Sequence, residues 1–242
     1  MYLSRLVLNP RSRAVRNDLS DCHNLHRTIL SAFPQAQKDQ GGARAGFGVL
    51  FRADADPRSG RITLLAQSNA EPDWSRLPED YLLDDFDELD NPAVKRVDEK
   101  YAALGDGARL RFRLRANPTK RLPLLIENRA GRDRGKRVEI FGEEGQLDWL
   151  RRKGERHGFR LLAARVNPSV LNARASPESK ITGWRDRSQP PMKFGSVLFE
   201  GELEITGAEK FRQTLADGIG SGKAYGFGLL SVAPIGFGGE DE

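Results

Sequence analysis

The segment RLRFRLR, residues 109–115, alternates arginine with apolar side chains without a break. A period of two puts Leu110, Phe112 and Leu114 on one side of an extended strand and the arginines on the other, whereas a helix would scatter both kinds around its axis. The pattern therefore predicts a sheet with one face packed on a core and one basic face. A face of that kind suits an anionic partner.

Patterns on either side of this strand predict elements in a repeated order. The first half is predicted to contain strands at 2–8, 46–53, 61–67 and 94–101, a helix at 22–33 and a weak helix at 73–83. The second half is predicted to contain strands at 109–115, 159–166, 196–205 and 229–232, and helices at 144–157 and 208–215. Polar loops are expected at 9–19 and 117–137, the latter as a basic hairpin insertion. The order β-α-β-β-α-β thus occurs twice, which predicts an α+β protein of two tandem ferredoxin-like domains, the topology of RNA-recognition motifs.

Length and composition narrow the class of protein. The chain has 242 residues, 30% of them charged and 38% hydrophobic, which excludes membrane-spanning and collagen-like proteins. Cys22 is the one cysteine, so no intramolecular disulfide can form. The amino-terminal apolar stretch is too short for a signal peptide, so the expected location is the cytoplasm. The glycine-containing segment 105–107 is the expected linker between domains 1–104 and 108–242.

Charge is distributed unevenly along the chain. Residues 109–137 contain eleven basic and two acidic side chains, a net charge of +9, whereas residues 71–100 carry a net charge of −7. A concentration of basic residues is typical of proteins that bind a polyphosphate, because each phosphate contact releases a counterion. The alternative is a solvated surface with ordinary charge scatter.

The glycine-rich stretch GIGSGKAYGFG, residues 218–228, resembles nucleotide-binding loops only superficially. A Walker A loop would need glycine at Asp217 and serine or threonine at Ala224. The stretch also follows a predicted helix and precedes a strand, the reverse of the order that phosphate loops need. No nucleotide cofactor is expected. The stretch is either a flexible turn or a place where RNA or the neighbouring domain approaches the backbone.

Two histidines share one face of the first predicted helix. His23 and His26 lie three residues apart, beside Arg27 and away from the apolar stripe of Leu25 and Ile29. No cysteine and no HExxH spacing completes a metal site, so no metal is expected. Such a pair suits RNA cleavage without a metal, in which a base deprotonates the 2′-hydroxyl and an acid protonates the 5′-oxygen. An exposed histidine is nevertheless more often idle than catalytic.

Separated segments of the chain carry a more specific resemblance, namely LVLNPRSRAVRNDL, NLHRTILSAFP, FRLRANPTKR, VLFEGELEI and GIGSGKAYGFGLLSVAP. In this order they resemble the repeat-processing endoribonucleases of type I-E Cascade complexes, the CasE family, over essentially the whole length. The resemblance implies two ferredoxin-like domains and a protein that binds the stem-loop of CRISPR repeat RNA. It implies one metal-free cut at the 3′ base of the stem, leaving a 5′-hydroxyl and a 2′,3′-cyclic phosphate. The product is expected to stay bound, with the other Cascade subunits as partners and a monomer outside the complex.

The resemblance also implies roles for particular residues. His26 becomes the general acid or base, and Arg27 becomes a phosphate contact. His23 stands where relatives commonly have tyrosine. Its role is left open: it is a second proton-transfer group, a hydrogen-bond partner of the scissile region, or neither. The glycines expected between the domains and beside RNA are Gly218, Gly220, Gly222, Gly226 and Gly228. The expected RNA-binding residues are Arg27, Arg11, Arg13, Arg111, Arg113, Arg115, Lys120, Arg121, Arg129, Arg132, Arg134, Lys136, Arg137 and Lys223.

Two other functions remain open on the sequence alone. A structural RNA-binding subunit of the same complex that has lost cleavage is one, because His23 departs from the family. A generic RNA-recognition protein is the other, and it would show no preference for a hairpin repeat over single-stranded RNA. Domains of that ordinary kind stack bases on aromatic side chains of the sheet, whereas RLRFRLR presents arginines.

Overall fold

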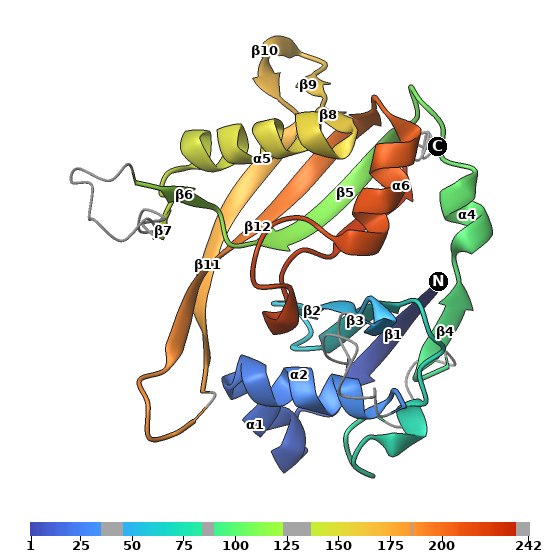
Figure 1. Cartoon of the computed structure of the whole chain (residues 1–242), viewed down its shortest axis with the longest axis vertical. Helices are drawn as coiled ribbons and strands as arrows, with labels where there is room; N and C mark the ends of the chain where they lie inside the picture. The colour runs from blue at the N-terminus through green and yellow to red at the C-terminus, as the bar shows by residue number, and fades with distance from the viewer. Residues whose placement is uncertain (35–45, 84–89, 123–136, 185, 236–242) are drawn as a thin grey trace, which may run out of the picture.

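A computed structural model describes residues 1–34, 46–83, 90–122, 137–184 and 186–235 (Figure 1). The elements of its first half are β1 (Tyr2–Leu8), α1 (Arg13–Ser20), α2 (Cys22–Ser31), β2 (Leu50–Ala55), β3 (Ile62–Ser68), the 3₁₀ turn η1 (Trp74–Arg76), β4 (Ala93–Arg96) and α4 (Asp98–Ala102). Those of its second half are β5 (Arg109–Ala116), β6 (Thr119–Arg121), β7 (Arg137–Glu139), α5 (Glu143–His157), β8 (Phe159–Leu161), β9 (Ala163–Ala164), β10 (Asn167–Leu171), β11 (Ala173–Gly183), β12 (Met192–Ile205), α6 (Ala208–Asp217), the 3₁₀ turn η2 (Lys223–Tyr225) and β13 (Leu230–Pro234).

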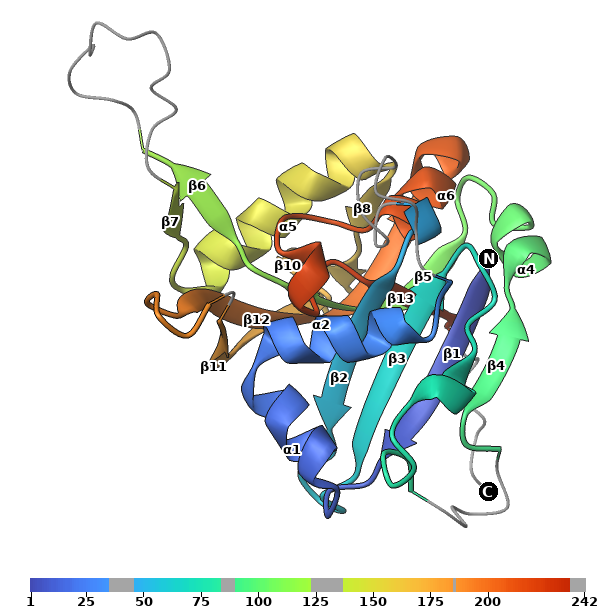
Figure 2. The same cartoon turned by 60° about the horizontal axis from the view of Figure 1, so that its bottom comes forward.

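The first half is built on a four-stranded antiparallel sheet in the order β2-β3-β1-β4. Helix α2 lies across this sheet (Figure 2) and buries Leu25 and Ile29 against Leu6 and Leu64. The helix begins because the Asp21 carboxylate accepts a hydrogen bond from the His23 backbone N–H at 3.0 Å, which caps its first turn. The predicted strand 2–8 and the helix beginning at residue 22 are thereby confirmed.

The second half is built on another antiparallel sheet, in the order β11-β12-β5-β13 with β8 paired to β12. Helices α5 and α6 cover one face of it (Figure 1). The alternation in β5 behaves as predicted, because Leu110, Phe112 and Leu114 are buried in a core with Leu150 and Phe211. Arg109, Arg111 and Arg113 are exposed on the opposite side of the strand, whereas Arg115 is buried.

Parts of the secondary structure differ from the sequence prediction. Residues 13–20 form helix α1, where a polar loop was expected, and the Ser12 hydroxyl caps it by accepting from the Val15 N–H. Residues 167–183 form β10 and β11, which the polar and proline-containing sequence concealed. Strand β11 is an edge of its sheet, the position where proline is tolerated.

The elements predicted for residues 73–101 also differ from those in the structure. The weak helix expected at 73–83 is reduced to the short turn η1, and the strand expected at 94–101 is β4 followed by helix α4. The described residues form two hydrophobic cores, one in each half. Tyr101 and Leu104 pack against the second core, although the predicted boundary assigns them to the first domain. No helix among the described residues is long and apolar enough to cross a membrane.

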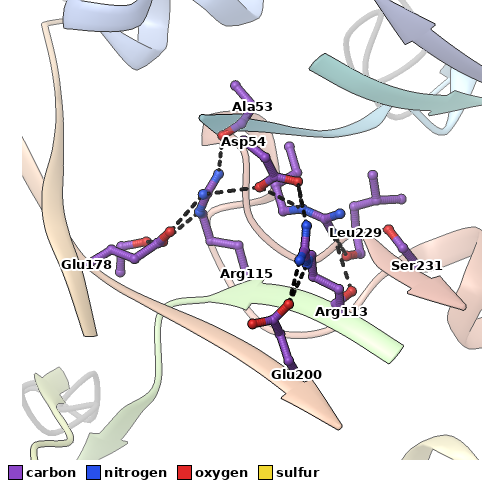
Figure 3. A network of polar contacts seen from close by, with 10 residues as sticks. Ala53, Asp54, Arg113, Arg115, Glu178, Glu200, Leu229 and Ser231 are labelled. Carbon is purple, nitrogen blue, oxygen red and sulfur yellow. Dashed lines mark hydrogen bonds and ion pairs between the residues drawn. The ribbon is translucent and has the colours of Figure 1, made fainter. Parts of the chain in front are cut away.

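A buried arginine of the first half joins it to the second (Figure 3). Arg52 of β2 is 3% exposed and donates from Nε to both Asp54 oxygens, at 3.0 and 2.8 Å. Its Nη1 atom crosses to the second half and donates to Arg113 O, Leu229 O and Ser231 Oγ, at 3.2, 3.4 and 3.0 Å. Burial lowers the pKa of Arg52, and the Asp54 charge opposes that shift. The guanidinium therefore ties one strand of the first sheet to two strands of the second.

Arg115 makes the reciprocal connection from β5. It forms a bidentate ion pair with Glu178 of β11, at 2.6 and 2.8 Å, and donates to Ala53 O of β2 at 2.7 Å. Its Nη2 atom also lies 3.3 Å from Asp54 Oδ1. Burial acts to raise the pKa of Glu178, but the hydrogen bond and charge of Arg115 outweigh it and hold that pKa below its usual value. Asp54 thus lies between two arginines from opposite halves (Figure 3).

We expect Arg52→Met to lower the free energy of unfolding by about 3 kcal/mol, because buried acceptors of both halves would lose their donor. Chemical denaturation followed by circular dichroism measures this change. Arg152→Met is the matched control, since Arg152 pairs with Asp148 on the exposed surface of α5. An equal effect of the two substitutions would contradict a role for Arg52 in joining the halves.

His157, the last residue of α5, makes stability depend on pH. Its Nδ1 lies 2.9 Å from Thr214 Oγ1 of α6, and burial, followed by the charge of Lys153, lowers its pKa from 6.5. The unfolded chain therefore binds this proton more readily than the folded protein does. We expect the free energy of unfolding to fall as the pH is lowered through 6.5 toward the folded pKa, and His157→Gln to weaken that dependence. Denaturation curves across this pH range, compared between the two proteins, test it.

Candidate active site

Helix α2 carries the two histidines singled out by the sequence. His23 and His26 are both half-buried, and Arg27 beside them is exposed to solvent. The Nδ1 atom of His23 is buried and has no hydrogen-bond partner among the described residues. A buried polar nitrogen without a partner is costly, so the protein carries an unmet hydrogen bond at this atom. The two side chains are one helical turn apart, as the spacing predicts.

His26 contacts one aromatic ring from each half of the chain. The Phe51 ring of β2 lies 6.4 Å from the imidazole centroid at an interplanar angle of 21°. The Tyr225 ring of η2 lies at the same centroid distance, edge-on at 64°. Phe51 belongs to the first core, whereas Tyr225 comes from the glycine-rich stretch about 200 residues away along the sequence. His26 therefore lies where the two halves meet.

The glycine-rich stretch forms the loop between α6 and β13 that contains η2. Its five glycines named above have φ between 75° and 90°, which an L side chain rarely adopts. Two of them also lie against the first half, because a Cβ at Gly218 would come 2.9 Å from Leu50 and one at Gly226 would come 3.4 Å from Phe51. Of the two interpretations left open, packing against the neighbouring half is therefore the one that the geometry supports.

A long hairpin of the second half braces the start of α2. Strands β11 and β12 project from their sheet toward α1 and α2 (Figure 1), and we call this projection the arm. At its end, the Trp184 N–H donates to the same Asp21 oxygen that caps α2, at 3.2 Å. Gly183 packs so closely that a Cβ there would lie 2.5 Å from Cys22 Sγ. Burial and then the Asp21 charge raise the pKa of Cys22 to about 11, so this residue stays a thiol.

The arginine face of β5 is not a free positive surface. Antiparallel pairing sets glutamates of β12 opposite these arginines, with Glu204, Glu202 and Glu200 in register with Arg109, Arg111 and Arg113. Arg113 donates to Glu200 at 2.8 Å, and Arg109 donates to Glu204 at 3.2 Å. Acidic side chains thus offset the positive charge counted along the sequence. RNA binding by Arg111, Arg113 and Arg115 stays a prediction, and the last two have contacts within the protein.

The basic hairpin insertion is confirmed at its base, where β6 pairs with β7. Three basic side chains are exposed there, and they form no ion pair with the other described residues. They are Lys120, Arg121 and Arg137. The hairpin adjoins the arm, because Glu139 of β7 accepts a hydrogen bond from Lys180 of β11 at 3.2 Å. The insertion, the arm and α2 therefore follow one another along the molecule. The predicted residues Arg129, Arg132, Arg134 and Lys136 lie outside the described part of the chain.

The other predicted RNA contacts are spread over the first half and the loop. Arg11 and Arg13 are exposed at the start of α1, and Lys223 is half-buried in η2. Across the described ranges, no cluster of three or more histidine, cysteine or acidic side chains is arranged to hold a metal ion. His157 lies at the junction of α5 and α6 with Thr214, apart from the pair on α2.

The sequence analysis missed the arm and Tyr225 as parts of this site. One signal was present for α1, where Ser12 precedes residues with helical spacing, Val15 and Leu19. No local signal could show that Trp184 would reach Asp21, because that contact joins residues 163 positions apart. Tyr225 lies within the glycine-rich stretch, and no local pattern distinguishes its position from that of the glycines around it.

Comparison with known proteins places this site in context. A family model described as CRISPR associated protein matches residues 1–234. The CRISPR-associated endoribonuclease Cse3 of Thermus thermophilus is 37% identical over 97% of this chain and 100% of its own length. The CRISPR system Cascade subunit CasE of Escherichia coli K12 is 34% identical with the same coverage. A solved structure of Cse3 bound to a 19-nucleotide RNA superposes with a TM-score of 0.76 at 36% identity, over 97% of this chain and 100% of that one.

Proposed function

The chain belongs to the CRISPR-associated protein family, and from this premise we propose that it is an endoribonuclease that binds the stem-loop of CRISPR repeat RNA and cleaves the precursor once. The proposal adds that the protein keeps the product as a subunit of the Cascade complex, as the name of the E. coli relative suggests. The observation that carries it is the position of His26, half-buried beside an exposed arginine at the meeting of the two halves.

The proposed reaction needs no metal ion and no cofactor. A base removes the proton of the 2′-hydroxyl upstream of the scissile phosphate, and this oxygen attacks the phosphorus. The bond to the 5′-oxygen breaks, and that oxygen takes a proton from an acid. The products are a 2′,3′-cyclic phosphate and a 5′-hydroxyl. The base gains one proton and the acid loses one. His26 serves in proton transfer, and Arg27 stabilises the phosphate charge.

His23 retains its alternatives under this proposal. It is a second proton-transfer group, a hydrogen-bond partner of the scissile region, or neither, and its half-buried position on α2 supports the first two. Imidazole titrates near neutral pH and is suited to either proton role. Its place one helical turn before His26 keeps both rings within reach of one phosphate.

We propose that the RNA stem runs along the basic insertion and the arm to α2. The exposed cations of β6 and β7 support this path, as does the contact between Glu139 and Lys180 that joins the insertion to the arm. The open face of β5 carries compensating glutamates, which favours the insertion for phosphate binding. A-form RNA is read mainly by its shape and its phosphates, so a long basic path is what such recognition requires.

We propose that the two sheets are two tandem ferredoxin-like domains, 1–104 and 108–242. The two orders, β2-β3-β1-β4 and β11-β12-β5-β13, support this. When the four strands of each order are numbered along the chain, both orders read second, third, first and fourth, with β8 paired to β12 as an addition in the second half. Gly107, with φ of 79°, lies at the junction between them.

We expect His26→Ala to lower the single-turnover cleavage rate of the host's repeat RNA by about 10²- to 10⁴-fold, because a proton-transfer group would be lost. The affinity for RNA should stay unchanged. The assay is run in excess EDTA, with a matched RNA carrying a 2′-deoxy sugar upstream of the scissile phosphate. Wild type should cut the ordinary RNA and leave the deoxy RNA intact.

The control variant is His157→Gln, which removes the histidine that does not lie on α2 and should cleave normally. Tight binding without cleavage by the wild type would favour a structural subunit and point to His23→Tyr as the first reversion. Cleavage that stops in EDTA and returns with a divalent ion would contradict the metal-free mechanism.

We expect Arg121→Ala to weaken binding of the repeat hairpin and to reduce the slope of log Kd against log salt by about 1, because one phosphate contact would be lost. Arg109→Ala is the matched control, since Arg109 pairs with Glu204 on the open face of β5. Fluorescence anisotropy titrations at several salt concentrations measure both. A larger effect of Arg109→Ala would place the RNA across the open sheets.

A further inference from the structure

The second half reaches His26 through Tyr225. The edge-on arrangement of the two rings, 64° between planes, is one of the geometries that aromatic pairs prefer. Phe51 contacts the same imidazole from the first half and is 1% exposed, so it is fixed by its own core. The orientation of the His26 ring therefore depends on a rigid contact within its own half and on a second contact across the junction.

Tyr225 is itself held in place by the arm. Its ring stacks on Phe194 of β12 with centroids 5.0 Å apart and planes at 27°. Its hydroxyl lies 3.8 Å from Met192 Sδ, and its backbone N–H donates to Gly222 O at 2.8 Å. A ring restrained on its far side and through its backbone can restrain the ring that it touches.

This arrangement lies at the surface beside the site. Tyr225, Phe194 and Met192 are all half-buried, and they belong to neither hydrophobic core of the described residues. Their burial therefore contributes less to folding than that of the core side chains does. What the contacts do provide is a connection from the arm, through Tyr225, to a side chain in the proposed active site.

We propose that Tyr225 is a positioning residue for His26 in RNA cleavage. The inference rests on the proposed role of His26 in proton transfer. The Tyr225 ring limits the imidazole to the rotamer that meets the scissile region, and its hydroxyl takes no part in the chemistry. Orientation of this kind affects the rate strongly, because proton transfer requires the donor and acceptor within hydrogen-bond distance.

The test compares Tyr225→Leu with Tyr225→Phe in the full chain, using the host's repeat RNA hairpin. Tyr225→Leu should lower the single-turnover rate by about 3- to 10-fold, the factor that corresponds to loss of one aromatic contact, and leave Kd unchanged. Tyr225→Phe keeps the ring and should cleave at the wild-type rate. Phe194→Leu removes the ring that stacks on Tyr225, and it should lower the rate by about 2-fold. Tyr2→Leu, at the start of β1, is the control and should change neither quantity.

The lowered rate at unchanged Kd and its rescue by Tyr225→Phe are what a purely structural role would not produce, and nuclear magnetic resonance checks the contact between the two rings. The chain has three histidines, and the spectrum of His26→Ala identifies the His26 signal. In Tyr225→Leu the His26 Hε1 resonance should shift, because the ring current of Tyr225 is lost, while that of His157 should stay in place. Wild-type rates in both Tyr225→Leu and Phe194→Leu, equal losses in Tyr225→Leu and Tyr225→Phe, or a parallel loss of affinity would each overturn the proposal. If His26→Ala cleaves normally, the proposed role of His26 fails instead, whatever the Tyr225 variants do, and a wild type that binds the hairpin without cutting it would overturn the proposed function.

Discussion

The geometry of the site depends on two buried arginines whose hydrogen bonds join the two halves. Arg52 donates to backbone and side-chain oxygens of the second half, while Arg115 donates to the backbone of the first and to Glu178. Groups buried in this way are favourable only when their hydrogen bonds are satisfied, so a different angle between the sheets would leave charges unpaired. The network therefore favours one relative orientation of the halves, and in that orientation Tyr225 lies against His26.

The same strand shows why charge counted along a sequence differs from charge on a surface. Eleven basic residues lie between 109 and 137, but sheet pairing brings the glutamates of β12 beside the arginines of β5. That register is set by contacts between residues about 90 positions apart, which no local pattern encodes. The insertion differs because its described basic residues project from a two-stranded hairpin beyond the sheet. Positive charge is therefore available at the insertion, where a polyanion can reach it.

The sequence predicted features that depend on residues close together along the chain, and it missed features that depend on distant residues. The strand at 109–115 and the helix beginning at residue 22 have strong local periodicity, and α6 and the strand after it were placed correctly as well. The sequence also singled out His23, His26 and the glycine-rich stretch, and the fold brings His26 and that stretch together, while their roles stay predictions. It did not identify α1, whose apolar face is narrow, nor β11, whose one proline, Pro177, is tolerated because β11 is an edge strand. The contacts of Trp184 and Tyr225 with α2 are long-range, so they required the fold.

The glycine-rich loop shows how a local sequence pattern and long-range contacts act together. Glycines in left-handed conformations lose much conformational entropy when a loop becomes ordered, and that cost must be offset by contacts. Ile219 and Phe227 supply part of the compensation by being fully buried, and Gly218 and Gly226 pack against Leu50 and Phe51 of the first half. The loop is therefore stable in this conformation only while the halves are docked. Because the loop carries Tyr225, the surroundings of His26 are complete only in the docked protein, and stability of the junction and competence of the site depend on the same contacts.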